Sequence, residues 1–300
     1  MARGALTAAV AGLLACLLWL SAGEAGAAGR ARHAAPDEVP VPALELDAPM
    51  TAYRAYVRRL LATLQVQLGT LSARLTAGDV AGAESAWLAA HLSWLQIGQD
   101  DGAYGAFGDL GRQIDGTSAG LVDGTADPGF TGFHKIELDL WTHGDLGAAT
   151  ADAAVLARLV AHLAHLPLGP ELPMTPVGLS TWTLRAHEIL EDGLRDSLSG
   201  ADEYGSGTAL ASIIADVAAT REMVTLLAPV IAPRAPRLVG RARRELVAVV
   251  RDAQAGRADG RWVAVGRLRA GLRERLDAAV GAVLETLAPI PDVIQVLGGS

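Results

Sequence analysis

Helical periodicity along most of the chain is the feature that most constrains its fold. Apolar residues recur every three or four positions in segments bounded by glycine, proline or short polar stretches. Aromatic residues make up only 4% of the chain, which suits closely packed helices better than sheets. We therefore expect an all-α protein, with helices near 50–77, 79–98, 131–142, 151–166, 178–199, 207–227, 236–255 and 260–287.

A proline-rich break divides the helical segments into two halves. The break is PLGPELPMTP, residues 167–176, and about four long helical segments lie on each side of it. A hydrophobic content of 51% is ample for a sizeable core. The sequence predicts two stacked four-helix bundles, residues 50–166 and 177–290.

The N-terminal residues have the pattern of an export signal. Arg3 precedes an apolar run and then small residues, so we expect a signal peptide over 1–27, with an uncleaved anchor as the alternative. The prolines of residues 28–49 indicate an extended linker. The expected location is secreted or extracytoplasmic, in a periplasm or cell envelope. Cys16 is the single cysteine, so a metal in the exported protein would need oxygen and nitrogen ligands.

Charge argues against a nucleic acid partner. The formal net charge is -8, which repels phosphate backbones. Half of the 24 arginines nevertheless fall between Arg234 and Arg275. This cluster is typical of a solvated helix face, and its alternative reading is a dock for an acidic partner or an anionic membrane surface.

The segment FTGFHKIELDLW, residues 130–141, sets a histidine and a glutamate in an apolar run. In a helix that turns about 100° per residue, Glu137 shares the inward face with Phe133, and His134 lies about 60° away. A buried carboxylate needs a partner. An imidazole and a carboxylate one turn apart can converge on one metal ion, as in di-iron bundles. The alternative is a structural ion pair.

Two other segments carry candidate ligands. His91 shares a helix side with Trp87, which fits a core histidine and also a ligand, and Asp101 joins that side if the helix continues so far. Glu191 stands four positions after His187 at the edge of an apolar face, where we expect a supporting role. The sequence has no Ser/His/Asp series, phosphate-cradling glycine loop or CxxC motif.

Several stretches together resemble a known family. They are TGFHKIELDLW, AYGAFGDLGRQID upstream, YRAYVRRLLATL near the start of the helical region, and EILEDGL with ADEYGSGTALA later. They resemble the imelysin-like family, and within it EfeO/EfeM-type iron-uptake proteins, roughly over residues 50–290. The G-x-H-x-x-E signature falls on Gly132, His134 and Glu137. The resemblance implies one domain of two bundles, with Asp115 and an acid near Glu191 joining the signature residues at a metal site.

The resemblance also implies a role without catalysis. An EfeUOB-like system would use this chain as its extracytoplasmic iron-binding component, carrying Fe2+ or Fe3+ beside a membrane iron permease and a haem peroxidase. Imidazole with carboxylates also suits Zn2+ or Mn2+. One alternative is an imelysin-like metallopeptidase, for which Glu191 is the candidate general base. Another is a structural cell-surface protein without metal.

The chain departs from the family pattern at two points. Longer relatives carry an N-terminal cupredoxin domain, which the residues before Met50 cannot form, so we expect the short form. The family usually shows two glutamates after an aromatic residue in the second helix, where this chain has Leu95 and Gly98. Asp101, one helical turn further on, is the candidate to replace them.

Overall fold

The computed structural model describes residues 41–98, 107–166 and 176–296. All long elements within these ranges are helices, and their β-structure is limited to one short hairpin and one isolated bridge. The prediction of an all-α fold is therefore confirmed. The expected signal peptide over 1–27, most of the expected linker and Asp101 lie outside the described residues.

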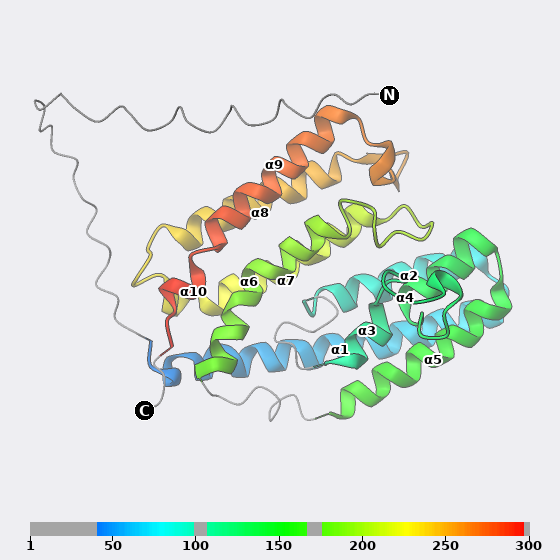
Figure 1. Ribbon diagram of the computed structural model, residues 1–300, viewed down its shortest axis with the longest axis horizontal. Helices are drawn as coiled ribbons and strands as arrows, with labels where there is room; N and C mark the ends of the chain where they lie inside the picture. The colour runs from blue at the N-terminus through cyan, green and yellow to red at the C-terminus, as the bar shows by residue number, and fades with distance from the viewer. Residues whose placement is uncertain (1–40, 99–106, 167–175, 297–300) are drawn as a thin grey trace, which may run out of the picture. The chain divides into compact units, whose positions relative to one another are not determined.

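The first half of the chain is built around α1, which packs against both α2 and α5 (Figure 1). Between α1 and α2, Gly78 adopts a left-handed conformation, and the Asp79 side chain caps α2 by accepting from the Gly82 amide. The π-helical turn η3 continues directly from α4. The elements are η1 (Ala43–Leu46), α1 (Asp47–Thr76), α2 (Val80–Leu95), α3 (Asp109–Asp115), η2 (Gly124–Ala126), α4 (Phe133–Glu137), η3 (Leu138–His143) and α5 (Leu146–His165).

The second half is a run of helices in which successive long neighbours pack together, α6 on α7, α7 on α8 and α8 on α9 (Figure 1). A short antiparallel hairpin, β1–β2, connects α8 to α9. The elements are α6 (Pro176–Arg195), α7 (Ala209–Ile231), α8 (Leu238–Gln254), β1 (Arg257–Ala258), β2 (Arg261–Trp262), η4 (Val265–Arg267), α9 (Ala270–Leu287) and α10 (Ile290–Val293).

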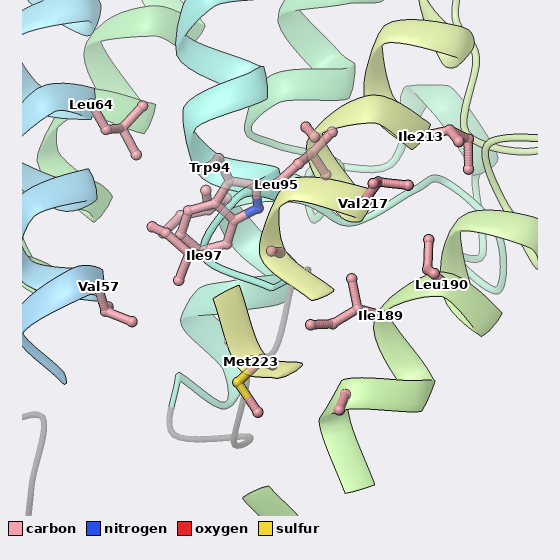
Figure 2. Packing of buried hydrophobic residues seen from close by; sticks show 14 of the residues in the cluster. Val57, Leu64, Trp94, Leu95, Ile97, Ile189, Leu190, Ile213, Val217 and Met223 are labelled. Carbon is pink, nitrogen blue, oxygen red and sulfur yellow. The ribbon is translucent and has the colours of Figure 1, made fainter. Parts of the chain in front are cut away.

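One cluster of buried apolar side chains runs through both halves. It is continuous because α7 packs against α1 and α2 as well as against its own neighbours. The predicted bundles therefore share a core. Figure 2 shows part of it, with residues from α1, from the end of α2 and the turn after it, from α6 and from α7: Val57, Leu64, Trp94, Leu95, Ile97, Ile189, Leu190, Ile213, Val217 and Met223.

Among the described residues, α5 is long and apolar enough to cross a membrane, with a mean hydropathy of 1.3 over its most apolar window. α5 packs against α1 and α4 and buries Leu156, Val160 and Leu163 on the inner side. Packing within the bundle therefore covers part of the helix, since 28% of this apolar window is buried.

Two boundaries differ in the kind of structure found there, and α5 also begins at Leu146 rather than at the expected 151. The helix expected over 260–287 begins only at Ala270, because Asp259 and Gly260 both have positive φ and turn the chain into the hairpin. Residues 41–49, expected in the linker, are packed against the bundle: Val41 and Leu46 are fully buried, and α1 already begins at Asp47. Apolar side chains among the prolines explain this docking.

A candidate metal centre

Gly132 brings α3 and α4 into direct contact. Its φ is +82°, and a Cβ at this position would lie 2.1 Å from the carbonyl oxygen of Ile114, so only glycine permits the approach. Beside it, the Thr131 hydroxyl donates to the Gln113 carbonyl over 2.7 Å. The glycine of the G-x-H-x-x-E signature thus places the last residue of α3, Asp115, next to the start of α4.

A tryptophan side chain on α2 forms a hydrogen bond to the start of α4. Trp87 Nε1 donates to the Phe133 carbonyl over 2.9 Å. One turn further along α2, the His91 ring packs on Trp87 and Phe133 and meets the His134 ring edge-on at 5.3 Å. These contacts bring α2, α3 and α4 together around the buried side chains of His91 and His134.

His91, Asp115 and His134 form a cluster with the spacing of metal ligands. Asp115 Oδ1 lies 2.9 Å from His91 Nε2 and 3.6 Å from His134 Nε2. Each residue offers one ligand atom, and the three atoms lie within 4.8 Å of one another. All three residues are at most 5% exposed. Nitrogen and oxygen donors of this kind suit Fe, Zn or Mn.

The hydrogen-bonding capacity of this cluster is unfilled. His91 Nδ1, His91 Nε2 and Asp115 Oδ1 are buried and have no hydrogen-bond partner, since the close approach of His91 to Asp115 lacks the alignment of a hydrogen bond. A buried polar group without a partner costs about 1–3 kcal/mol. A cation bound by one nitrogen of each imidazole and by the Asp115 oxygen would give these donors a partner, so the residues fit a bound metal ion.

Glu137 orients His134. Its Oε2 lies 3.2 Å from His134 Nδ1, which leaves the Nε2 of that ring directed towards Asp115. Its Oε1 accepts hydrogen bonds from the amides of Tyr204 and Ser206, at 3.0 and 2.9 Å, and from the Ser206 hydroxyl at 2.7 Å. Both oxygens of Glu137 are thus engaged. A carboxylate that fixes the ring of a ligating histidine is a recurrent feature of metal sites.

A small hollow opens beside the cluster between residues of both halves. Glu137 ties the α6–α7 connection to α4, and this connection supplies two acidic side chains, Asp202 and Glu203, to the wall. Asp202 Oδ2 accepts from the Ser197 hydroxyl over 2.7 Å. The lining residues are Trp87, His91, His134, Glu137, Asp202, Glu203, Ser206, Thr208, Ala209 and Ser212.

The electrostatics of the hollow favour positive charge. Burial opposes a charged His134, but the carboxylates of Asp115 and Glu137 outweigh it and raise the pKa of His134 from 6.5 to about 10. Burial likewise opposes charge on Glu137, whose pKa is nevertheless lowered, mainly by His134. Burial raises the pKa values of Asp202 and Glu203, and neighbouring carboxylates add to the effect. A bound cation would offset the repulsion among these neighbouring carboxylates.

The structure brings some of the predicted site residues together and places others elsewhere. His134, Glu137 and Asp115 lie together, and Glu137 is buried as the helical face predicted. The side chain of Glu191 is 57% exposed, pairs with His187 at 3.4 Å, and does not line the hollow. Asp101 lies outside the described residues.

Sequence reasoning left one residue undecided and missed a segment. On its own helix His91 fits a core histidine better than a ligand, and its approach to Asp115 is a contact between helices that no single-helix pattern contains. The loop 202–206 belongs to ADEYGSGTALA, a stretch that resembles the family, but the helical patterns point to none of its residues as candidates. The adjacent acids in ADEYGSG were the signal that could have drawn attention to it.

A known family matches the first half of the chain. The family model described as Imelysin (Peptidase_M75) covers residues 49–167, the range that contains the α3–α4 contact and the G-x-H-x-x-E signature. Residues 49–167 are similar to this family. The resemblance expected from the sequence is thus confirmed. The word peptidase in the family label assigns no activity to this chain.

EfeO proteins are similar to about two thirds of this imelysin-like chain. The iron uptake system component EfeO of Yersinia pseudotuberculosis is 27% identical over 209 residues, which are 68% of this chain and 53% of the relative. EfeO of Escherichia coli K12 is 26% identical over 198 residues, or 66% and 51% of the two chains. The chain therefore spans about half the length of the curated relatives it matches.

The stability of the metal-free protein is expected to fall as the pH rises from about 6.5 towards 10. His134 has a pKa of about 10 in the fold and 6.5 as its ordinary value, so its protonation stabilises the fold fully below pH 6.5 and is lost above pH 10. Urea unfolding at a series of pH values measures this. His134→Gln should flatten the profile, and equal slopes in both proteins would contradict the assignment.

Gly132→Ala should destabilise the protein more than Gly144→Ala. Both glycines have positive φ, but a Cβ at Gly144 meets open space, whereas one at Gly132 collides with the Ile114 carbonyl. We expect about 1 kcal/mol for strain alone at Gly144, and a clearly larger loss at Gly132 because α3 must also move. Denaturant unfolding of both variants tests this, and similar losses would show that the α3–α4 approach is not tight.

Proposed function

We propose that this imelysin-like chain is an iron-binding component of an iron uptake system and carries the iron ion as cargo. His91, Asp115 and His134 bind the ion, and Glu137 holds His134 in the orientation for binding. This assignment changes the role expected for Glu137, because both of its oxygens are already engaged by His134 and by the 204–206 loop. The chain acts by binding and release, without catalysis.

The observation that carries the proposal is the unfilled hydrogen-bonding capacity of the cluster. Three ligand atoms from separate helices lie within 4.8 Å, and those of His91 and Asp115 have no hydrogen-bond partner. The alternative is a structural ion pair between His91 Nε2 and Asp115 Oδ1, which lie 2.9 Å apart, and metal titration distinguishes the two readings. The acidic wall formed by Asp202 and Glu203 adds attraction for a cation.

The relatives support iron among the metals that these donors accept. Imidazole and carboxylate ligands also suit Zn2+ and Mn2+, and the named function of the EfeO relatives is iron uptake. We propose an extracytoplasmic location, with a membrane iron permease and a haem peroxidase as partners in the same system. Both follow from the resemblance to EfeO.

A metallopeptidase is the second reading of the family label, and the arrangement of the residues disfavours it. A zinc peptidase needs a general base beside the metal-bound water. Glu191, the candidate for that role, is exposed and paired with His187. A peptidase assay with and without chelator tests this reading directly, and chelator-sensitive hydrolysis would revive it.

The test of the proposal compares two histidines. His91→Gln should weaken binding of Fe2+, titrated without oxygen, and of Mn2+ by at least 10–100-fold, since it removes a ligand. His143→Gln is the matched control, because its side chain is 52% exposed and lies outside the hollow, and it should bind like the wild type. Metal analysis of the purified wild type gives an independent measure.

Three results would contradict the proposal. A wild-type protein that binds neither Fe2+ nor Mn2+ would favour the structural reading. Equal affinities of the two histidine variants would remove His91 from the site. Loss of folding in metal-free His91→Gln, measured by urea unfolding, would assign His91 to the core.

A further inference from the structure

The exposed side of α8 carries positive charge and no acid. At about 100° per residue, the exposed residues of this helix lie within a sector of about 160°. They are Gly240, Arg241, Arg243, Arg244, Val247, Arg251 and Gln254, and the exposed Arg237 immediately before the helix lies in the same sector. We call Arg237, Arg241, Arg243, Arg244 and Arg251 the arginine face.

The arginine face differs from an ordinary solvated helix surface, where charges of both signs are mixed. The neighbouring helix α9 shows such a mixture, with Glu274, Arg275 and Asp277 exposed. Charge is also separated along the chain. Residues 234–275 contain twelve arginines and four acidic residues, a net charge of +8, so the rest of the chain carries -16. Such a separation indicates an interaction with an anionic partner.

Two arginines of the face have acidic partners on the same helix. Arg241 Nε lies 2.8 Å from Glu245 Oε1, and this acid is 21% exposed. Arg251 Nη2 lies 2.9 Å from Asp252 Oδ2, and this acid is 9% exposed. With both acids counted, the arginine face still keeps a net charge of +3.

The other arginines are presented along an ordered helix. Arg237 and Arg244 are exposed and form no ion pair with any described residue. They stand seven positions apart, which is about two turns on one side of the helix. Val247, in the same sector, is 66% exposed. The opposite side of α8 buries Leu246 and packs on α7 and α9 (Figure 1).

We propose that the arginine face binds the surface of an anionic phospholipid membrane. Phosphate groups repeat across such a surface, and a guanidinium matches a phosphate with paired hydrogen bonds. The arginines follow α8 over about 25 Å and line no pocket among the described residues, which favours an extended surface over a compact acidic ligand. A basic helix face with an exposed apolar residue such as Val247 is typical of helices that lie at a membrane interface.

The negative charge of the whole chain does not prevent this contact. In physiological salt, charges act on one another over about 8 Å, so the membrane interacts mainly with the face that lies on it. Repulsion of the remaining acids orients the protein with α8 towards the membrane. No residue of the arginine face lines the hollow, so the inference goes beyond the proposed function and does not depend on it.

The experiment measures co-sedimentation with lipid vesicles. It uses residues 38–300, the compact unit that contains every described helix and the whole described core, because the apolar residues 5–20 can enter a membrane by themselves. One set of vesicles is phosphatidylcholine, and the other is phosphatidylcholine and phosphatidylglycerol in equal parts. We expect binding to the anionic vesicles alone, and weaker binding as salt screens the charges.

The double variant Arg237→Gln/Arg244→Gln should bind the anionic vesicles roughly 25-fold more weakly, about fivefold for each charge. Arg58→Gln/Arg158→Gln is the matched control, since it removes two exposed arginines from α1 and α5, and it should bind like the wild type. Arg237→Lys/Arg244→Lys should keep most of the binding because lysine keeps the charge. Urea unfolding should show equal stability for all variants, because the replaced side chains are exposed.

Equal binding by the two glutamine double variants, equal binding to both kinds of vesicle, or binding that salt does not weaken would overturn the proposal. Binding of the wild type to soluble polyglutamate and not to vesicles, lost in Arg237→Gln/Arg244→Gln, would assign the arginine face to an acidic protein instead. Absence of binding to both probes would make it an ordinary solvated surface. None of these results bears on the metal site, which is tested with Fe2+ and Mn2+.

Discussion

The carboxylate of Glu137 is the interaction on which the rest of the site depends. One oxygen contacts His134 in the first half of the chain, and the other accepts three hydrogen bonds from the loop 204–206 in the second half. A buried carboxylate requires such compensation, because desolvation of the charge costs several kcal/mol. Its placement therefore fixes a histidine ring and an acidic loop at once, and the hollow lies between them.

The site is also a concentration of polar groups that folding alone would not favour. His91 and Asp115 leave buried atoms without hydrogen bonds, and Asp202 and Glu203 have raised pKa values beside them. Replacing such groups with apolar residues often stabilises a protein. The proposed binding of a cation would account for His91 and Asp115 at the junction of α2, α3 and α4, and for the two acids of the α6–α7 connection beside them.

Much of the fold and part of the site could be predicted from the residues. The expected helices correspond to α1, α2, α5, α6, α7 and α8 with small shifts at their ends, because periodicity and glycine or proline boundaries are local signals. The exception is α9, where the expectation ran through the hairpin at Asp259 and Gly260. The arginine-rich sequence there is also compatible with a helix, but the turn residues Asp259 and Gly260 favour a hairpin.

The sequence by itself determined that the chain is helical and that Glu137 faces inward with His134 beside it, since both follow from the geometry of a single helix. Only the tertiary structure decided that His91 meets Asp115, that Glu137 binds the 204–206 loop, and that the pKa of His134 rises. These contacts join separate helices, and the approach of those helices depends on packing, such as that of Gly132 on the Ile114 carbonyl. Helical periodicity contains no information about which helix is the neighbour.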